Sequence, residues 1–226
     1  MTEAVLFAGP SAWGLAPACV QDAAIDWRPP VRRGDIERLV DESAQPGVVI
    51  VCDGVFKVAA AVSHRELCGA IDAGWQVWGV SSLGAIRAHE LRGEGMIGFG
   101  TVHAMFDRFE DFTDDEMCLL HFPEAPYFPL SVPLVNLRHA LDQRAGELGI
   151  SQASADETIA RLRALWFGDR TEERIRSVMV DAAGVDDHRV TALLDWLKQH
   201  RVKTTDLQHL LAQRPWRERA VRARTP

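Results

Sequence analysis

The sequence predicts an α/β fold, with a Rossmann-like, mostly parallel sheet in the first half and an all-helical lobe behind it. In the first half of the chain, short apolar runs alternate with helical patterns, as they do in βαβ units. After about residue 130, apolar residues recur only at helical spacing. We therefore expect an α/β core over residues 1–128 and a helical region over residues 129–226.

Three apolar runs predict the buried strands of this sheet. Residues 4–8 (AVLFA) are the first run, which ends at Gly9-Pro10, and residues 48–51 (VVIV) are the second. Residues 75–80 are the third. Continuous apolar runs are typical of parallel strands, because helices cover both faces of such a sheet.

Helical patterns follow these strands. Residues 35–42, 63–73 and 83–91 predict helices that cover the sheet. The second of them begins with a capping box, in which Ser63 is the N-cap and Glu66 occupies the third helical position. Helices of the predicted C-terminal lobe span residues 132–148, 155–166, 172–183, 187–200 and 205–213.

Composition narrows the functional class of these 226 residues. Hydrophobic residues make up 47% of the chain, and its net charge of -7 argues against a nucleic-acid binder. Its apolar runs are shorter than the roughly 18 residues of a membrane span, and its N-terminus lacks the charged start of a signal peptide. Four widely spaced cysteines predict neither a zinc site nor a redox pair. We expect a cytoplasmic protein that does not bind a membrane.

Polar residues follow all three predicted strands, at Ser11, at Asp53 and at Ser81-Ser82. The carboxyl ends of parallel strands meet at one edge of a sheet, and open α/β sheets bind their ligands there. We therefore predict a site where these side chains converge. For any one strand end, a turn or a helix cap is the simpler interpretation.

Residues 79–91 (GVSSLGAIRAHEL) are the most informative segment, because they place two serines where a strand turns into a helix. The N–H groups of a helix N-terminus bind anions. The nucleophile-elbow pattern G-x-S-x-G is only half satisfied, since Ser81 lacks the second glycine and Ser82 lacks the first. The serines are therefore candidates either for a nucleophile or for an anion-binding helix start.

Other charged residues have two interpretations each. His64 is a candidate general acid or base, and the alternative is an exposed surface histidine. Arg87 and Glu90 lie three residues apart on one predicted helix, where an exposed pair contributes little stability. The acidic run 114–116 (DDE) is more simply a helix start than a metal site, and we expect no metal.

Seven blocks occur in a fixed order along the chain: GPS (9–11), PP…GD (29–35), DGVF (53–56), VSHREL (62–67), the segment 79–91, DDE (114–116) with His121, and PLVNLR (133–138). Together they resemble the TfuA-like protein family over about residues 4–140. In that family the central block reads roughly G-x-S-S-M-G-A-L-R-A-x-E-L. Leu83 replaces the Met and Ile86 replaces the first Leu here.

The resemblance implies a part in thioamide formation. TfuA-like proteins act beside YcaO proteins, which use ATP to activate a backbone amide so that sulfide replaces its oxygen in a ribosomal peptide or protein. The TfuA-like partner is expected to stimulate the YcaO enzyme. It is also expected to release sulfide from a thiocarboxylated ThiS-like sulfur carrier protein, as a hydrolase that needs no cofactor.

Hydrolysis of a thioacid requires a base and donors for the developing oxyanion. With the resemblance, His64 or Asp53 is the expected base, and the helix start at Ser81 and Ser82 supplies a nucleophile or the oxyanion donors. The residues expected to bind substrate are Ser11, Glu66, Arg87 and Glu90.

Two other functional classes stay open. A non-catalytic adaptor would bind and activate the YcaO enzyme and present the peptide, with the helical region and residues 121–128 (HFPEAPYF) as docking surfaces. A nucleotide-binding α/β protein is a third hypothesis, against which the missing phosphate-loop motif argues. Cys52 stands where an aliphatic residue is expected in relatives, either as a buried strand thiol or as a sulfur-handling one.

Overall fold

The computed structural model describes residues 2–55 and 60–218. Phe56, the last residue of the DGVF block, lies outside these ranges. The chain forms two compact units: unit 1 comprises Met1–Glu110 and Lys203–Pro226, and unit 2 comprises Asp111–Val202. Within the described ranges, no helix has the length and apolar character needed to cross a membrane.

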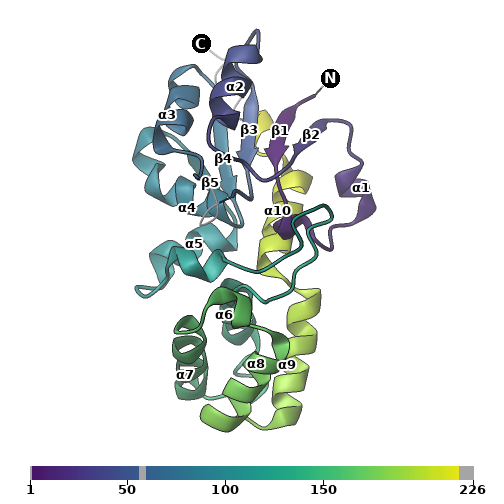
Figure 1. Ribbon diagram of the computed structural model, residues 1–226, viewed down its shortest axis with the longest axis vertical. Coiled ribbons are helices and arrows are strands. Elements are labelled where there is room, and N and C mark those ends of the chain that lie inside the picture. The colour runs from purple at the N-terminus through teal and green to yellow at the C-terminus, as the bar shows by residue number, and fades with distance from the viewer. Residues whose placement is uncertain (1, 56–59, 219–226) are drawn as a thin grey trace. The chain divides into compact units, whose positions relative to one another are not determined.

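Unit 1 is built on a five-stranded sheet in which all paired strands are parallel (Figure 1). The strand order is β2-β1-β3-β4-β5, so the direction of winding reverses between β1 and β3. Open α/β sheets bind ligands beside such a switch point. The strands are β1 (Ala4–Phe7), β2 (Ile25–Arg28), β3 (Val48–Val51), β4 (Gln76–Val80) and β5 (Ile97–Phe99).

The three central strands confirm the three predicted from apolar runs. Every residue of β1 is buried, and so are the last three of β3 and the last four of β4. The edge strands β2 and β5 were not predicted. They are only partly buried, so their sequences lack a continuous apolar run.

Helices α2 (Asp35–Glu42), α3 (His64–Asp72) and α4 (Leu83–Glu90) confirm the helices predicted in the first half of the chain. The capping box of α3 is present, because the Ser63 hydroxyl accepts from the Glu66 N–H and the Glu66 carboxylate accepts from the Ser63 N–H at 3.0 Å. Among the described residues before position 110, the other α-helices are α1 (Pro17–Val20) and α5 (Thr101–Arg108).

Helix α10 (Val202–Gln213) returns from the far end of the chain to the sheet of unit 1. The apolar side chains of α10 pack together with side chains of the central strands in one buried cluster. The members of this cluster that connect helix and sheet include Leu6, Ile50, Trp78, Val80, Leu207, Leu210 and Leu211. One face of the sheet is therefore covered by a helix that follows unit 2 in the sequence.

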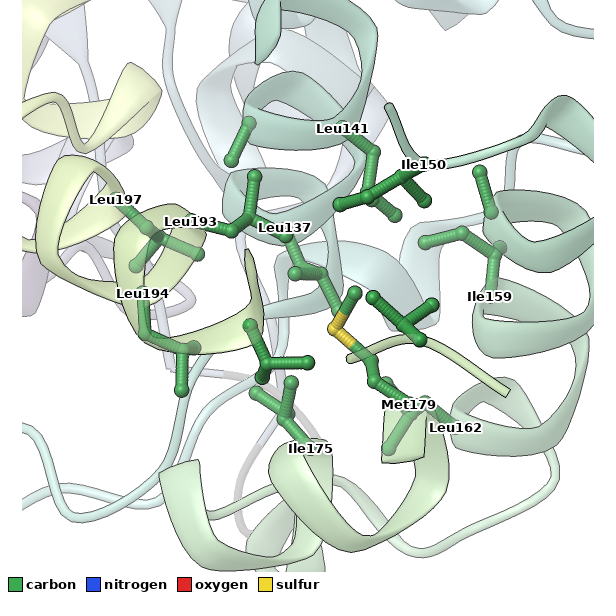
Figure 2. Close-up of a cluster of buried hydrophobic side chains, with 14 of the residues drawn as sticks. Leu137, Leu141, Ile150, Ile159, Leu162, Ile175, Met179, Leu193, Leu194 and Leu197 are labelled. Atoms are coloured by element: carbon green, nitrogen blue, oxygen red, sulfur yellow. The ribbon is translucent and has the colours of Figure 1, made fainter. Parts of the chain in front are cut away.

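Unit 2 is helical and has its own core, in which side chains from four successive helical segments meet around Met179 (Figure 2). These segments account for the helical patterns predicted between residues 132 and 200. They are α6 (Leu134–Arg144), α7 (Gln152–Arg163), α8 (Glu172–Ser177) with the π-helical turn Val178–Ala182, and α9 (Asp187–Gln199).

Candidate functional site

The turn from β4 to α4 has a strained backbone at Ser81. This residue takes a φ of 66°, in the left-handed region that a residue with a side chain seldom adopts, and it is 0% exposed. Such a conformation costs about 1–3 kcal/mol and persists only where the surrounding structure imposes it. A serine on a sharp strand-to-helix turn is the defining feature of a nucleophile elbow.

Two glycines let α4 approach the sheet closely at this turn. A Cβ on Gly79 would lie 2.0 Å from the carbonyl oxygen of Gly84, and a Cβ on Gly84 would lie 1.7 Å from that of Val51. Neither position therefore accepts a side chain. The second glycine stands three residues after Ser81 instead of two, which is why the G-x-S-x-G pattern is incomplete although the close packing is present.

The Ser81 hydroxyl points to the first turn of α10. Its Oγ donates to the carbonyl oxygen of Lys203 at 2.6 Å. In the same turn, the Thr204 hydroxyl donates to the carbonyl oxygen of Trp13 at 3.1 Å. Lys203 is itself buried, with 2% exposure. The start of α10 therefore lies against the segments that follow β1 and β4.

Asp53 ties the end of β3 to the segment that follows β1. Its Oδ2 accepts from the N–H groups of Gly9 at 2.8 Å and Ser11 at 3.0 Å, and its Oδ1 accepts from the Ser11 hydroxyl at 2.7 Å. Both Asp53 and Ser11 are buried. The structure thus brings two of the three predicted strand ends into direct contact, at the switch point of the sheet.

The Cys52 thiol contacts the Asp53 carboxylate at 3.8 Å and interacts with the Ser81 hydroxyl. Burial and the neighbouring Asp53 raise the pKa of the Cys52 thiol well above its usual range, against smaller opposing effects from the Ser81 hydroxyl, Lys203 and the Ser11 hydroxyl. A thiol of this kind stays protonated at neutral pH and packs as a small apolar group. Of the two interpretations of Cys52, the structure favours the buried strand thiol.

We refer to Ser11, Cys52, Asp53, Ser81 and Lys203 as the strand-end cluster. Ser82 is buried beside it and is the N-cap residue of α4, where its carbonyl oxygen accepts from the N–H groups of Ala85 and Ile86. Lys203 was not predicted, because it is separated from Ser81 by 122 positions and no local pattern marks it.

His64, Arg87 and Glu90 form a separate surface group on α3 and α4. Glu90 Oε2 lies 2.7 Å from His64 Nε2 and accepts from Arg87 at 2.6 Å, while Arg87 Nε donates to the Val62 carbonyl at 3.2 Å. Although burial opposes it, the hydrogen bonds from His64 and Arg87 lower the pKa of Glu90. The His64 side chain is 52% exposed, so this group faces solvent.

Glu66, predicted to bind substrate, connects two helix starts. Its carboxylate accepts from the Ser63 N–H and hydroxyl and, at 2.6 Å, from the N–H of Gly34, which precedes α2. Glu66 therefore has a structural role, because its carboxylate holds the starts of α2 and α3 together. Of the predicted residues, the strand-end cluster contains Ser11, Asp53 and Ser81.

Asp206 is a second buried residue of α10 that sequence reasoning missed. Its carboxylate accepts from the N–H groups of Thr101 at 2.9 Å and Val102 at 2.8 Å, at the start of α5. Gly100 leaves the space for it, since a Cβ there would lie 2.4 Å from the Asp206 carboxyl carbon. Burial raises the pKa of Asp206 to about 6, although both hydrogen bonds oppose the shift.

This pKa predicts a specific pH dependence of stability. The pKa of Asp206 in the folded protein exceeds its ordinary value of 3.8. Protonation of Asp206 therefore stabilises the folded state fully below pH 3.8, and this stabilisation is lost as the pH rises through about 6. The Asp206→Asn variant lacks this titration. Between about pH 4 and pH 7, the free energy of unfolding of the wild type should fall by roughly 1–3 kcal/mol relative to that of the variant. Urea denaturation at several pH values measures this difference, and a constant difference would contradict the prediction.

The acidic run 114–116 lies in unit 2 and is engaged by arginines. Glu116 is fully buried, and Arg138 donates to its two carboxylate oxygens at 2.8 and 2.7 Å, while Arg163 donates at 3.1 Å. Asp115 pairs with the buried Arg170. Over the described ranges, no group of three or more His, Cys, Asp or Glu residues is arranged to hold a metal ion.

The fold and the strand-end cluster define an α/β protein with buried polar residues at the carboxyl edge of a parallel sheet. The TfuA-like protein family matches the chain over residues 53–171, which is more than half of it. The chain therefore belongs to the TfuA-like family, whose members associate with YcaO proteins, and its membership supports a role in thioamide formation. No curated protein matched the chain in a sequence comparison.

Proposed function

We propose that this protein releases sulfide by hydrolysing a thiocarboxylated ThiS-like carrier protein, and that it thereby supplies and stimulates a YcaO enzyme that thioamidates a ribosomal peptide or protein. Family membership supports the place in thioamide formation. The observation that carries the hydrolytic step is the buried, left-handed Ser81, which lies beside Cys52 and Lys203 at the carboxyl edge of the sheet.

The chemistry of the cluster suits a thiocarboxylate. The reaction converts R–COS⁻ and water into R–COO⁻, HS⁻ and a proton, so the substrate and both main products are anions. Lys203 supplies a cation in a poorly solvated setting, where its attraction for an anion is stronger than in water. The partial positive charge at the N-terminus of α4 favours the oxyanion of the tetrahedral intermediate. Because Ser81 and Lys203 are both buried, the tail of the carrier gains access when the first turn of α10 moves.

Asp53 is the candidate base within the cluster, since it already accepts a hydrogen bond from the Ser11 hydroxyl. His64 is held by Glu90 on the surface, with Arg87 bonded to the same carboxylate oxygen. In this proposal the surface group binds the carrier, because the His64 side chain is exposed, and the reaction takes place at the strand-end cluster.

The Lys203→Met variant tests this placement. The substitution removes the ammonium group and keeps the backbone carbonyl that accepts from Ser81. We expect kcat/KM for sulfide release from a thiocarboxylated carrier to fall about 100-fold, which corresponds to about 2.7 kcal/mol. Lys203→Arg keeps the positive charge and should retain more of the activity.

Lys198→Met is the matched control, because Lys198 is an exposed lysine of unit 2 that pairs with Glu172 at 2.8 Å. It should leave sulfide release unchanged. Release by Lys203→Met at the wild-type rate would contradict the placement of the site.

The second candidate function is the non-catalytic adaptor that binds the YcaO enzyme and presents the peptide. The observation in its favour is a set of exposed apolar side chains on one segment of unit 2: Leu120, Phe122, Phe128 and Leu130. An adaptor would stimulate thioamide formation by the YcaO enzyme and release no sulfide from the carrier by itself.

A further inference from the structure

We propose that Asp206 is a positioning residue for this reaction: it holds the first turn of α10 against the strand-end cluster, and the tail of the carrier enters when this contact breaks. The inference rests on the proposed function and deepens it, because it names the residue that controls the movement of α10. Three features of unit 1 carry it: the polar character of that turn, the partners of Asp206, and the burial of its carboxylate.

The first turn of α10 is held by polar contacts, whereas the rest of the helix is held by apolar ones. Residues 203–206 (KTTD) are polar, and the leucines that pack against the sheet begin at Leu207. The contacts of this turn include hydrogen bonds of the Lys203 carbonyl, the Thr204 hydroxyl and the Asp206 carboxylate. A segment with few buried apolar contacts opens at a lower free energy than the core. The first turn can therefore move while the leucines keep the rest of α10 on the sheet.

Asp206 makes the contacts that connect this turn to α5. Its carboxylate accepts from the N–H groups of Thr101 at 2.9 Å and Val102 at 2.8 Å. N–H groups in the first turn of a helix have no acceptor within that helix, and a carboxylate there also gains from the helix dipole. Asp206 lies about one helical turn after Lys203. Breaking its contact with α5 therefore also frees Lys203 to move away from the cluster.

Burial of the Asp206 carboxylate makes the opening of this turn depend on pH. From α5 it faces the N–H groups of Thr101 and Val102 and the Thr101 hydroxyl, and from α10 it faces His209. All of these oppose the effect of burial, which nevertheless raises the pKa of Asp206 to about 6 in the closed turn. Contact with water in the open turn would return the pKa to its ordinary value of 3.8. The open turn therefore binds the proton less tightly, and opening should become about 10-fold more favourable between pH 5 and pH 8.

The first test is amide hydrogen exchange of the full-length protein, resolved by NMR and corrected for the intrinsic pH dependence of exchange. The amides of Thr101 and Val102 report the contact directly, because they donate to Asp206. Their protection factors should fall about 10-fold between pH 5 and pH 8, and should stay below those of the buried strand β3. In Asp206→Asn, whose side chain is neutral at every pH, they should stay constant. Wild-type protection that is independent of pH, or equal to that of β3, would overturn the proposal.

The second test is the KM for sulfide release from a thiocarboxylated carrier. Only the open protein binds the tail, so the apparent KM varies inversely with the open fraction. The ratio of the wild-type KM to that of Asp206→Asn should therefore fall about 10-fold between pH 5 and pH 8, while the ratio of the kcat values changes little. A merely structural role would instead change the amount of active protein, and with it the apparent kcat.

Asp35→Asn is the matched control, because the Asp35 carboxylate also accepts from a backbone N–H, that of Arg32 at 2.8 Å, but at an exposed site. It should show the wild-type pH dependence in both measurements. A KM ratio for Asp206→Asn that does not change with pH, with sulfide still released, would overturn the role of Asp206 and leave the proposed hydrolysis intact. No sulfide from the wild type would instead refute the proposed function itself, and with it this role.

Discussion

Replacing Asp53 with alanine is expected to lower the free energy of unfolding by about 3–5 kcal/mol. The carboxylate accepts from two backbone N–H groups and one hydroxyl, all contributed by Gly9 and Ser11. Because the site is buried, water does not replace the lost acceptor, and each unpaired donor costs about 1–3 kcal/mol. Urea denaturation of the variant and the wild type measures the difference.

Asp53→Asn is the control for this prediction. Its amide oxygen still accepts hydrogen bonds, so the loss should be smaller, about 1–2 kcal/mol. An alanine variant within about 1 kcal/mol of the wild type would show that Asp53 does not hold the segment after β1 in place, and the geometry of the strand-end cluster would then need another explanation.

A second large effect is expected in unit 2, where Glu116→Ala should cost about 3–5 kcal/mol. Glu116 is 0% exposed and neutralises two arginines, Arg138 and Arg163. Although burial opposes it, the hydrogen bonds that Arg138 donates to Glu116 and Asp111 raise the pKa of Arg138. Removing Glu116 therefore leaves a largely buried guanidinium that stays charged. Denaturation with hydrogen exchange as a second readout assigns the loss to unit 2.

Asp111 offers a matched comparison, because it bonds to the same two arginines as Glu116. Its side chain is 52% exposed, so water takes over its role when it is removed. Asp111→Ala should therefore cost only about 0–1 kcal/mol. If the two alanine variants lose equal stability, burial of Glu116 is not the source of the effect.

The central sheet was predictable because its strands are buried on both faces, and the same physical reason explains what was missed. Runs such as residues 48–51 carry the burial pattern in the sequence itself. The edge strands β2 and β5 are partly exposed, and their mixed composition resembles that of a loop. The amphipathic pattern of α10 predicted a helix, but such a pattern does not specify which surface the helix covers.

The candidate site was predictable where topology brings residues together. Ser11 and Asp53 follow strands that the structure pairs side by side, and their contact follows from the parallel order. Lys203 and Asp206 reach the same edge only because α10 folds back onto unit 1. No sequence pattern near Lys203 or Asp206 indicates that α10 folds back onto unit 1. These two site residues can therefore be found only from the tertiary structure.

The family blocks acquire physical meaning from these contacts. DDE and PLVNLR are joined by the ion pair between Glu116 and Arg138. The central block supplies Ser81 and the glycines that let α4 approach the sheet. The segment 79–91 therefore combines a close-packing requirement with a strained hydroxyl, and the second of these is the basis of the proposed chemistry.

The most direct test of this account is sulfide release by the wild-type protein, incubated with a thiocarboxylated carrier protein and no YcaO enzyme. The account predicts sulfide in amounts that exceed the protein present, with the carrier converted to its carboxylate form. A carrier that keeps its thiocarboxylate, under conditions where addition of the protein still stimulates the YcaO enzyme, would contradict the account and favour the adaptor.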